Sequence, residues 1–239
     1  HIDLPTVSQS LNEARLRFVE GASVRFDTFP DYLGYEVIPI IWDCWPRYVD
    51  NMVRWFYKHR VRTAFFTSSQ TAERMRNLCP QVNIFHLPEA IEIEIYHAGK
   101  PLIERSIDYL EFGRCSRILD SSMFDERIKV LSSRNEKSGL ATRGQLVDAL
   151  ANSKITLALT RLDNQPELAE GIDTLTQRYW ECMLSRVVII GRAPQELIDI
   201  VGYDPIVHLN LNHANEQILD IISHIEDYQP LVDKNRATA

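Results

Sequence analysis

Short apolar runs of strand length alternate with amphipathic segments of helical length, and this alternation constrains the fold more than any other feature of the chain. Two of the apolar runs are Val37–Trp42 and Lys154–Thr160. Between such runs, apolar residues recur at helical spacing, as in Tyr48–Arg60. Strands that alternate with helices in this way form parallel sheets with crossover helices. The pattern therefore predicts an α/β protein with two Rossmann-like units.

The same pattern assigns most of the chain to individual elements. The predicted strands are 37–42, 63–67, 82–87, 107–112, 128–131, 154–160, 187–190 and 206–211. The predicted helices are 1–22, 48–60, a helix that starts at Ser68 and ends at Pro80, 145–151, 174–185, 194–201 and 214–228. A polar loop is predicted over 161–171, directly before the helix that carries the candidate site.

The order of these elements predicts two domains joined by a linker. The predicted boundaries are a first unit over 1–95, a linker over 96–105, a second unit over 106–228 and a polar tail over 229–239. The linker region has Gly and Pro beside charged residues, although Glu92 and Glu94 just ahead of it also fit the outer face of an edge strand. Only three strands precede the linker, so the first unit is predicted to be short or truncated.

Charge and cysteine content limit the binding partners and the cellular compartment that we expect. The 239 residues include 26 Lys and Arg against 33 Asp and Glu, which gives a formal net charge of −7. An acidic chain argues against a nucleic-acid partner held through backbone phosphates. The net charge does not exclude a local basic pocket for one small phosphate ligand. The four cysteines are far apart, and no apolar run or leader pattern indicates membrane insertion or export. We therefore expect a cytoplasmic protein.

Several common catalytic motifs are missing from the sequence. The nine glycines form neither G-x-G-x-x-G nor a P-loop, and H-E-x-x-H and G-x-S-x-G do not occur. No two aspartates stand two residues apart, so there is no D-x-D pair to hold a divalent metal against a diphosphate. These absences argue against nicotinamide dehydrogenases, P-loop NTPases, zinc peptidases and typical serine hydrolases. We expect neither a metal nor a cofactor.

The most informative stretch is Asp173–Glu181, at the start of the helix predicted over 174–185. Thr174 and Gln177 have the spacing of a capping box, and a helix that follows a buried parallel strand directs its N-terminus into the ligand crevice of a doubly wound sheet. The helix amides and the charge of Arg178, one turn in, suit a diphosphate. The two carboxylates stand two turns apart and can share a face. An ordinary capped helix with a solvated Glu181 explains the same pattern.

This stretch resembles the E-x7-E segment of retaining GT-B glycosyltransferases. The match continues through Cys182–Gly191, and the helix end and strand ahead of the motif, Leu150–Thr160, also fit. Leu110–Arg114 resembles the first strand of the nucleotide-sugar domain and its Gly-Arg turn, and Trp42–Arg47 is similar to a bacterial polysaccharide branch of these enzymes. The resemblance covers about 37–211 and implies two Rossmann-like units of the GT-B type. It also implies that the unit over 1–95 is on the acceptor side and that the unit over 106–228 binds the nucleotide sugar.

The resemblance also implies roles for individual residues. It implies that Glu181 binds the ribose hydroxyls of the donor nucleotide and that Asp173 contacts the transferred sugar. The amides of Thr174, Leu175 and Thr176 are implied to bind the diphosphate. Arg114 matches the basic residue that neutralises the leaving phosphate, and Arg117 is a substitute for a lysine that is out of register. The implied activity is metal-independent transfer, with retention, from a nucleotide diphosphate sugar.

Some positions depart from the family pattern. Asp173 replaces a glutamate, Arg186 stands where glycine is usual, and Val188 where proline is usual. A non-catalytic nucleotide-binding or assembly module that keeps the fold therefore stays an alternative, as does an unrelated two-unit enzyme such as an epimerase.

The acceptor is implied to be a growing cell-envelope glycan or a lipid-linked chain. A basic run interleaved with aromatics fits either a solvated helix face or peripheral association with the inner face of an anionic membrane. The basic residues are Arg47, Arg54, Lys58, Arg60 and Arg62.

Overall fold

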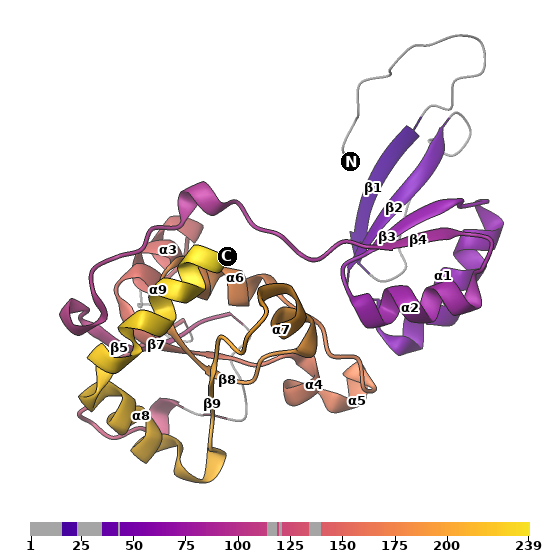
Figure 1. Cartoon of the computed structure of the whole chain (residues 1–239). Helices are drawn as coiled ribbons and strands as arrows, with labels where there is room; N and C mark the ends of the chain where they lie inside the picture. The colour runs from indigo at the N-terminus through magenta and orange to yellow at the C-terminus, as the bar shows by residue number, and fades with distance from the viewer. Residues whose placement is uncertain (1–15, 23–34, 43, 114–118, 120, 134–139) are drawn as a thin grey trace. The chain divides into compact units, whose positions relative to one another are not determined.

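The computed structural model describes residues 16–22, 35–42, 44–113, 119, 121–133 and 140–239. The chain divides into two compact units. The first unit comprises residues 1–89 together with 165–174, and the second comprises 90–164 together with 175–239. Each unit is a Rossmann-like α/β unit built on a parallel sheet (Figure 1). The predicted fold class is confirmed at this level.

The first unit contains a four-stranded parallel sheet in the order β1-β2-β3-β4. Its strands are β1 (Leu16–Ala22), β2 (Glu36–Trp42), β3 (Thr63–Phe66) and β4 (Asn83–His86). Its helices are α1 (Pro46–Lys58), α2 (Ser69–Leu78) and the short α5 (Pro166–Ala169). Helices α1 and α2 lie on one face of this sheet (Figure 1). The core of the unit is therefore formed between that face and these two helices.

Local sequence explains both crossover helices of this unit. Pro46 occupies the first turn of α1, where its missing N–H costs nothing, and Met52 and Phe56 face the core one turn apart. Helix α2 begins after Ser68, whose hydroxyl accepts a hydrogen bond from the Thr71 N–H at 3.3 Å. Both helices start within two residues of their predicted positions.

The prediction of a helix over 1–22 is wrong for its described part. Residues 16–22 form β1, which pairs with β2 in parallel over its full length, from Leu16 opposite Glu36 to Ala22 opposite Trp42. The backbone hydrogen bonds of this pairing outweigh a local apolar pattern that is only roughly helical. Residues 1–15 lie outside the described part of the chain.

The second unit contains a five-stranded parallel sheet in the order β6-β5-β7-β8-β9. Its strands are β5 (Ile107–Glu111), β6 (Val130–Ser132), β7 (Ser153–Ala158), β8 (Val188–Gly191) and β9 (Val207–His208). Its helices are α3 (Arg143–Ala151), α4 (Arg161–Asn164), α6 (Gln177–Leu184), α7 (Gln195–Val201), α8 (Ala214–Ser223) and α9 (Gln229–Thr238). In chain order this sheet reads 2-1-3-4-5, an order of doubly wound sheets in which ligands bind where the order reverses, here between β5 and β7.

Both faces of the second sheet are covered. On one face, Leu110 and Ile189 pack in a core with Leu150 of α3, Tyr179 of α6 and Leu197 of α7. The opposite core joins residues of β5, β7 and β8 to α8 and α9. Strand β8 is buried at every position. The continuous apolar runs in the sequence thus mark strands that are buried on both faces.

Two segments expected to be a linker and a polar tail are parts of the second unit. In the expected linker, Tyr96 is 3% exposed and Leu102 is fully buried. The expected tail forms α9, and its Val232 is fully buried in the core beneath α8 and α9. None of the helices in the described ranges is long and apolar enough to cross a membrane.

Candidate functional site at the carboxyl edge of the second sheet

The carboxyl ends of β5, β7 and β8 bring polar residues to one edge of the second sheet. Gly113 follows β5 by two residues, Thr160 follows β7 by two, and Arg192 directly follows β8. Strands β5 and β7 flank the point where the strand order reverses. Ligands of open α/β sheets bind outside this edge at such a switch point.

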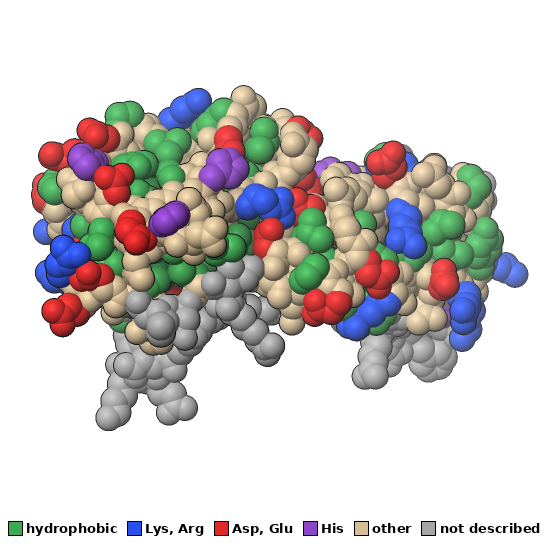
Figure 2. Space-filling view, turned by 90° about the horizontal axis from the view of Figure 1, so that it is seen from below, with side chains coloured by type: hydrophobic (Ala, Val, Ile, Leu, Met, Phe, Trp, Pro, Cys, Tyr) green, Lys and Arg blue, Asp and Glu red, His purple; other side chains and the backbone are tan. Residues whose placement is uncertain are grey.

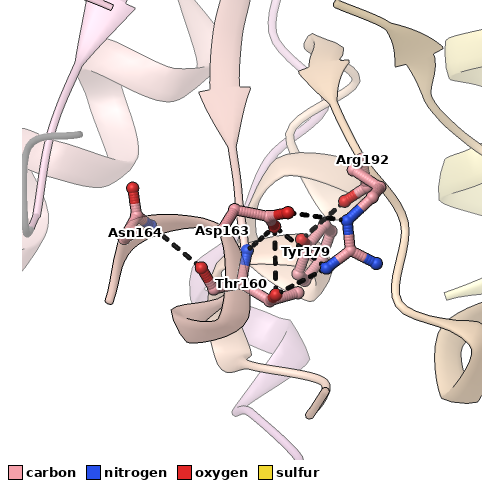
Figure 3. Close-up of polar contacts among 5 residues, drawn as sticks. All are labelled: Thr160, Asp163, Asn164, Tyr179 and Arg192. Atoms are coloured by element: carbon pink, nitrogen blue, oxygen red, sulfur yellow. Dashed lines mark hydrogen bonds and ion pairs between the residues drawn. The ribbon is translucent and has the colours of Figure 1, made fainter. Parts of the chain in front are cut away.

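Arg192 is the centre of a hydrogen-bonded network at this edge (Figure 3). Its Nε donates to Asp163 Oδ1 at 2.8 Å, and its Nη2 donates to Asp163 Oδ2 at 3.0 Å. The same Nη2 donates to the hydroxyl of Thr160 at 2.8 Å. Such a two-bond pairing of guanidinium and carboxylate fixes orientation as well as distance.

The partners of Arg192 are themselves held in place. Asp163 accepts hydrogen bonds from both the backbone N–H and the hydroxyl of Thr160, each at 3.0 Å, so the start of α4 is tied to the end of β7. Tyr179 of α6 is fully buried, and its phenol donates to the backbone carbonyl of Arg192 at 2.8 Å. Asn164 donates to the carbonyl of Thr160 at 3.0 Å, as Figure 3 shows. The network therefore joins β7, α4, α6 and β8 into one rigid edge.

A second arginine, Arg178, lies at the end of β5. Its guanidinium carbon is 4.8 Å from the centre of the Phe112 ring, a cation–π contact. A Cβ placed on Gly113 would lie 2.1 Å from Nη2 of Arg178, and Gly113 has a φ of +73°. A side chain at this turn would displace the guanidinium from its present position, and the left-handed φ by itself favours glycine.

Arg178 stands in the first turn of α6, which runs from Gln177 to Leu184 and has no acidic residue in that turn. A helix N-terminus carries a partial positive charge, and the guanidinium of Arg178 adds a full positive charge near it. The position of Arg178 therefore favours a negatively charged ligand at this edge.

Glu181 is partly buried in the middle of α6. Its Oε1 accepts a hydrogen bond from the phenol of Tyr96 at 2.9 Å. Burial of Tyr96, together with the charge of Glu181 and this hydrogen bond, raises the pKa of the phenol to about 12, and Arg143 only partly offsets this. Glu181 is thus a carboxylate held from one side by a neutral phenol.

The predicted helix over 174–185 is too long at its N-terminus, and its capping box does not form. The N-cap is Thr176, without a side-chain cap hydrogen bond. Leu175 is fully buried, and its N–H donates to Glu196 Oε2 at 3.4 Å. Burial of this leucine and its bond to α7 hold the segment ahead of α6 in an extended form. The Leu175 amide, expected to bind a diphosphate, is therefore engaged by Glu196.

The other predicted site residues fall in different parts of the chain. Arg114 and Arg117 lie outside the described residues. Asp173 and Thr174 belong to the first unit, where the N–H of Asp173 donates to Gln70 Oε1 at 2.8 Å. The structure brings together Thr176, Arg178 and Glu181 on α6. Because α6 begins only at Gln177, the prediction that Asp173 and Glu181 share one helix face is wrong. Their implied roles toward a donor stay predictions.

The sequence interpretation missed Arg192, Asp163 and Tyr96. Arg192 follows a glycine at the end of a buried strand, the same signal that singled out Arg114 after Gly113. The polar loop predicted over 161–171 instead contains the short helices α4 and α5, and Asp163 lies on α4. Tyr96 stands at the start of the expected linker. Neither has a local motif, because its partner is 29 residues away in the first case and 85 in the second.

Among the described residues, no group of three or more His, Cys, Asp or Glu side chains is arranged to hold a metal ion. No protein-family model matches this sequence, and no curated protein matches it either.

Proposed function

We propose that the chain is a glycosyltransferase that moves a sugar from a nucleotide diphosphate donor to a glycan or lipid-linked acceptor of the cell envelope. The proposal is of a retaining, metal-independent enzyme of the GT-B type. The observation that carries it is Arg178, a cation in the first turn of α6 whose guanidinium lies against Gly113 at the switch point of the second sheet. A diphosphate supplies the negative charge that this arrangement favours.

In the proposed reaction, bond cleavage places negative charge on the departing nucleotide diphosphate. Arg178 and the first amides of α6 stabilise this charge, with Arg114 and Arg117 as further expected cations. Glu181 accepts hydrogen bonds from the ribose hydroxyls, and Asp173 contacts the transferred sugar. Arg192, fixed by Thr160 and Asp163, holds the end of β8 in position beside this site.

The end of α6 also supports the resemblance on which the proposal rests. Arg186 follows the C-cap Ser185 and has a φ of 55°, a left-handed conformation that favours glycine. Its N–H donates to the carbonyl of Met183, and the Val187 N–H donates to that of Cys182, which is a Schellman motif. Glycine is usual at this position in the resembled enzymes. Here Arg186 takes a left-handed conformation of the kind that glycine adopts readily, and it forms an ion pair with Asp233.

The basic residues of the first unit fit the proposed acceptor. All five of the basic residues considered for membrane association are exposed, and three of them lie on α1. Figure 2 shows lysine and arginine side chains dispersed among acidic ones on the face it presents. The proposed membrane association is accordingly peripheral, through the headgroups of an anionic inner leaflet.

Thermal shift with UDP, GDP, ADP and dTDP tests donor binding. At a hundred times its dissociation constant, a ligand of the native state stabilises it by about 2.7 kcal/mol. We expect such a shift with at least one nucleotide, and its loss in Glu181→Ala and Arg178→Ala. Arg54→Ala, which removes an exposed arginine of α1, is the matched control and should keep the shift. Absence of a shift with all four nucleotides would contradict the proposal.

Turnover separates the transferase from a non-catalytic nucleotide-binding module. The wild-type protein is incubated with the sugar conjugate of the nucleotide that gives the largest shift, and released nucleoside diphosphate is measured. Slow donor hydrolysis or transfer supports an enzyme. Binding without any release after prolonged incubation, with and without membrane extract as acceptor, favours the module.

A further inference from the structure

The segment 90–105, which we call the strap, carries the chain from Glu89 into the second unit and places a buried tyrosine against the candidate site. Tyr96 is 3% exposed and belongs to the core that also contains Leu150, Tyr179 and Cys182. Its phenol donates to Glu181 Oε1 at 2.9 Å. The strap thus reaches a residue that the proposed function assigns to the donor nucleotide.

The strap is held by contacts that do not involve Glu181. Gly99 has a φ of +62°, and a Cβ at this position would lie 1.9 Å from the backbone carbonyl oxygen of Ala151. The strap backbone therefore lies directly against the end of α3, at a distance that only glycine permits. His97 Nε2 also lies 3.1 Å from Asp148 Oδ1 on the same helix.

Arg105 fixes the other end of the strap. Arg105 is 2% exposed, and its guanidinium donates to the carbonyl oxygens of Ala98 at 2.7 Å and Lys100 at 2.9 Å. It also donates to the carbonyl oxygens of Ser153 and Ser185, at 2.8 and 3.1 Å. One buried side chain thus ties the strap to the start of β7 and to the end of α6. The segment that directly follows Tyr96 is thus fixed by contacts that do not depend on Glu181.

A phenol in this position supplies one fixed hydrogen bond to a carboxylate and leaves lone pairs for a ligand. An ionised carboxylate has about four acceptor sites, and a phenol donates one hydrogen. The raised pKa of Tyr96, about 12, keeps the phenol protonated, and therefore a donor, throughout the physiological range. Tyr96 can thus orient Glu181 without competing for all of its acceptor capacity.

We propose that Tyr96 is a positioning residue for the donor nucleotide, whose phenol holds the Glu181 carboxylate in the orientation that receives the ribose hydroxyls. The inference rests on the proposed function of Glu181. The strap is then a structural part of the donor site rather than only a connection between two units. Loss of the phenol leaves Glu181 free to adopt other rotamers, and binding must order it again.

The test is a double-mutant cycle on nucleotide affinity, with Tyr96→Phe, Glu181→Ala and the double variant. Dissociation constants are measured by calorimetry for UDP, GDP and ADP and for their 2′-deoxy counterparts. Tyr96→Phe is expected to weaken ribonucleotide binding by roughly 2- to 12-fold, the cost of ordering one long side chain. The effect should shrink for the 2′-deoxy forms and vanish when Glu181→Ala is already present, because that variant has no side-chain oxygen for the phenol to hold.

Tyr203→Phe is the matched control, because it also removes a phenol hydrogen bond from the second unit, to Asn235 at 2.8 Å. It should leave every dissociation constant unchanged, and thermal melts of all variants establish that they are folded. Equal affinity of wild type and Tyr96→Phe would overturn the inference while leaving the proposed function intact. An equal loss for ribo- and deoxynucleotides, or a loss that adds to that of Glu181→Ala, would also overturn it. Failure of wild type to bind any of these nucleotides would overturn both proposals.

Discussion

The two units use the same parallel strand-helix alternation but bury their sheets differently. In the first unit, α1 and α2 cover one face, and on β3 and β4 the Phe65 and Phe85 rings stack with centroids 5.5 Å apart while Phe85 stays 49% exposed. In the second unit, two separate cores cover both faces, and β8 is buried throughout. The comparison teaches that the second sheet is the more rigid platform. It is also the sheet whose edge carries the arginine network.

The largest expected difference between the units comes from their strands. Ile189→Ala removes a fully buried side chain of β8 and should lower the free energy of unfolding of the second unit by about 2–5 kcal/mol. Phe85→Ala, at a half-exposed position of β4, should cost the first unit less than about 2 kcal/mol. Calorimetric unfolding of both variants measures the two costs. Equal losses of unfolding free energy in the two variants would contradict the difference in burial between the two sheets.

Glycine substitutions test the comparison of the two units through smaller effects on stability. Gly99→Ala combines a left-handed φ with a backbone clash at 1.9 Å and should destabilise the second unit by about 2–4 kcal/mol. Gly171→Ala in the first unit has a φ of +87° but nothing within 4 Å of the new Cβ, so only the backbone cost of about 1–2 kcal/mol applies. Chemical denaturation of both variants measures the difference. If Gly171→Ala proves as costly as Gly99→Ala, packing of the strap is looser than described.

The smallest effects are expected at two helix N-caps, one in each unit. Ser68→Ala leaves the Thr71 N–H without its cap at a buried position and should cost about 1–2 kcal/mol. Thr142→Ala acts at an exposed position, where Gln145 keeps its bonds to the backbone N–H groups of Ala141 and Thr142, and should cost about 0.5–1 kcal/mol. Thermal melts of the two variants test the order. A larger cost for Thr142→Ala would show that exposure does not govern the cap energies here.

The sequence predicted the strands of both units well because buried parallel strands leave a continuous apolar signal. Lys154–Thr160 and Val187–Ile190 became β7 and β8 with shifts of one or two residues. The strand β1 was mistaken for a helix, since only its pairing with β2 decides its conformation. Local pattern thus identified the elements that hydrophobic burial dictates and failed where a long-range backbone partner decides.

The same limit applies to the candidate site. The spacing Thr-x-x-Gln occurs at Thr142 and again at Thr174, but only the first forms a capping box. At the second, burial of Leu175 and its bond to Glu196 keep the backbone out of the helix. Arg178 and Glu181 were found from the sequence because they share a helix. The partners of Glu181 and Arg192 were not, because they come from distant segments.

The route of the chain has a practical consequence for dissecting the protein. Residues 165–174 belong to the first unit although their neighbours in sequence on both sides belong to the second. The chain therefore changes units three times, after Glu89, after Asn164 and after Thr174. No single cleavage or truncation can therefore release either unit with all of its residues. A fragment intended to isolate the sheet beside Arg192 has to begin near Ala90. In that fragment a short designed loop has to replace residues 165–174.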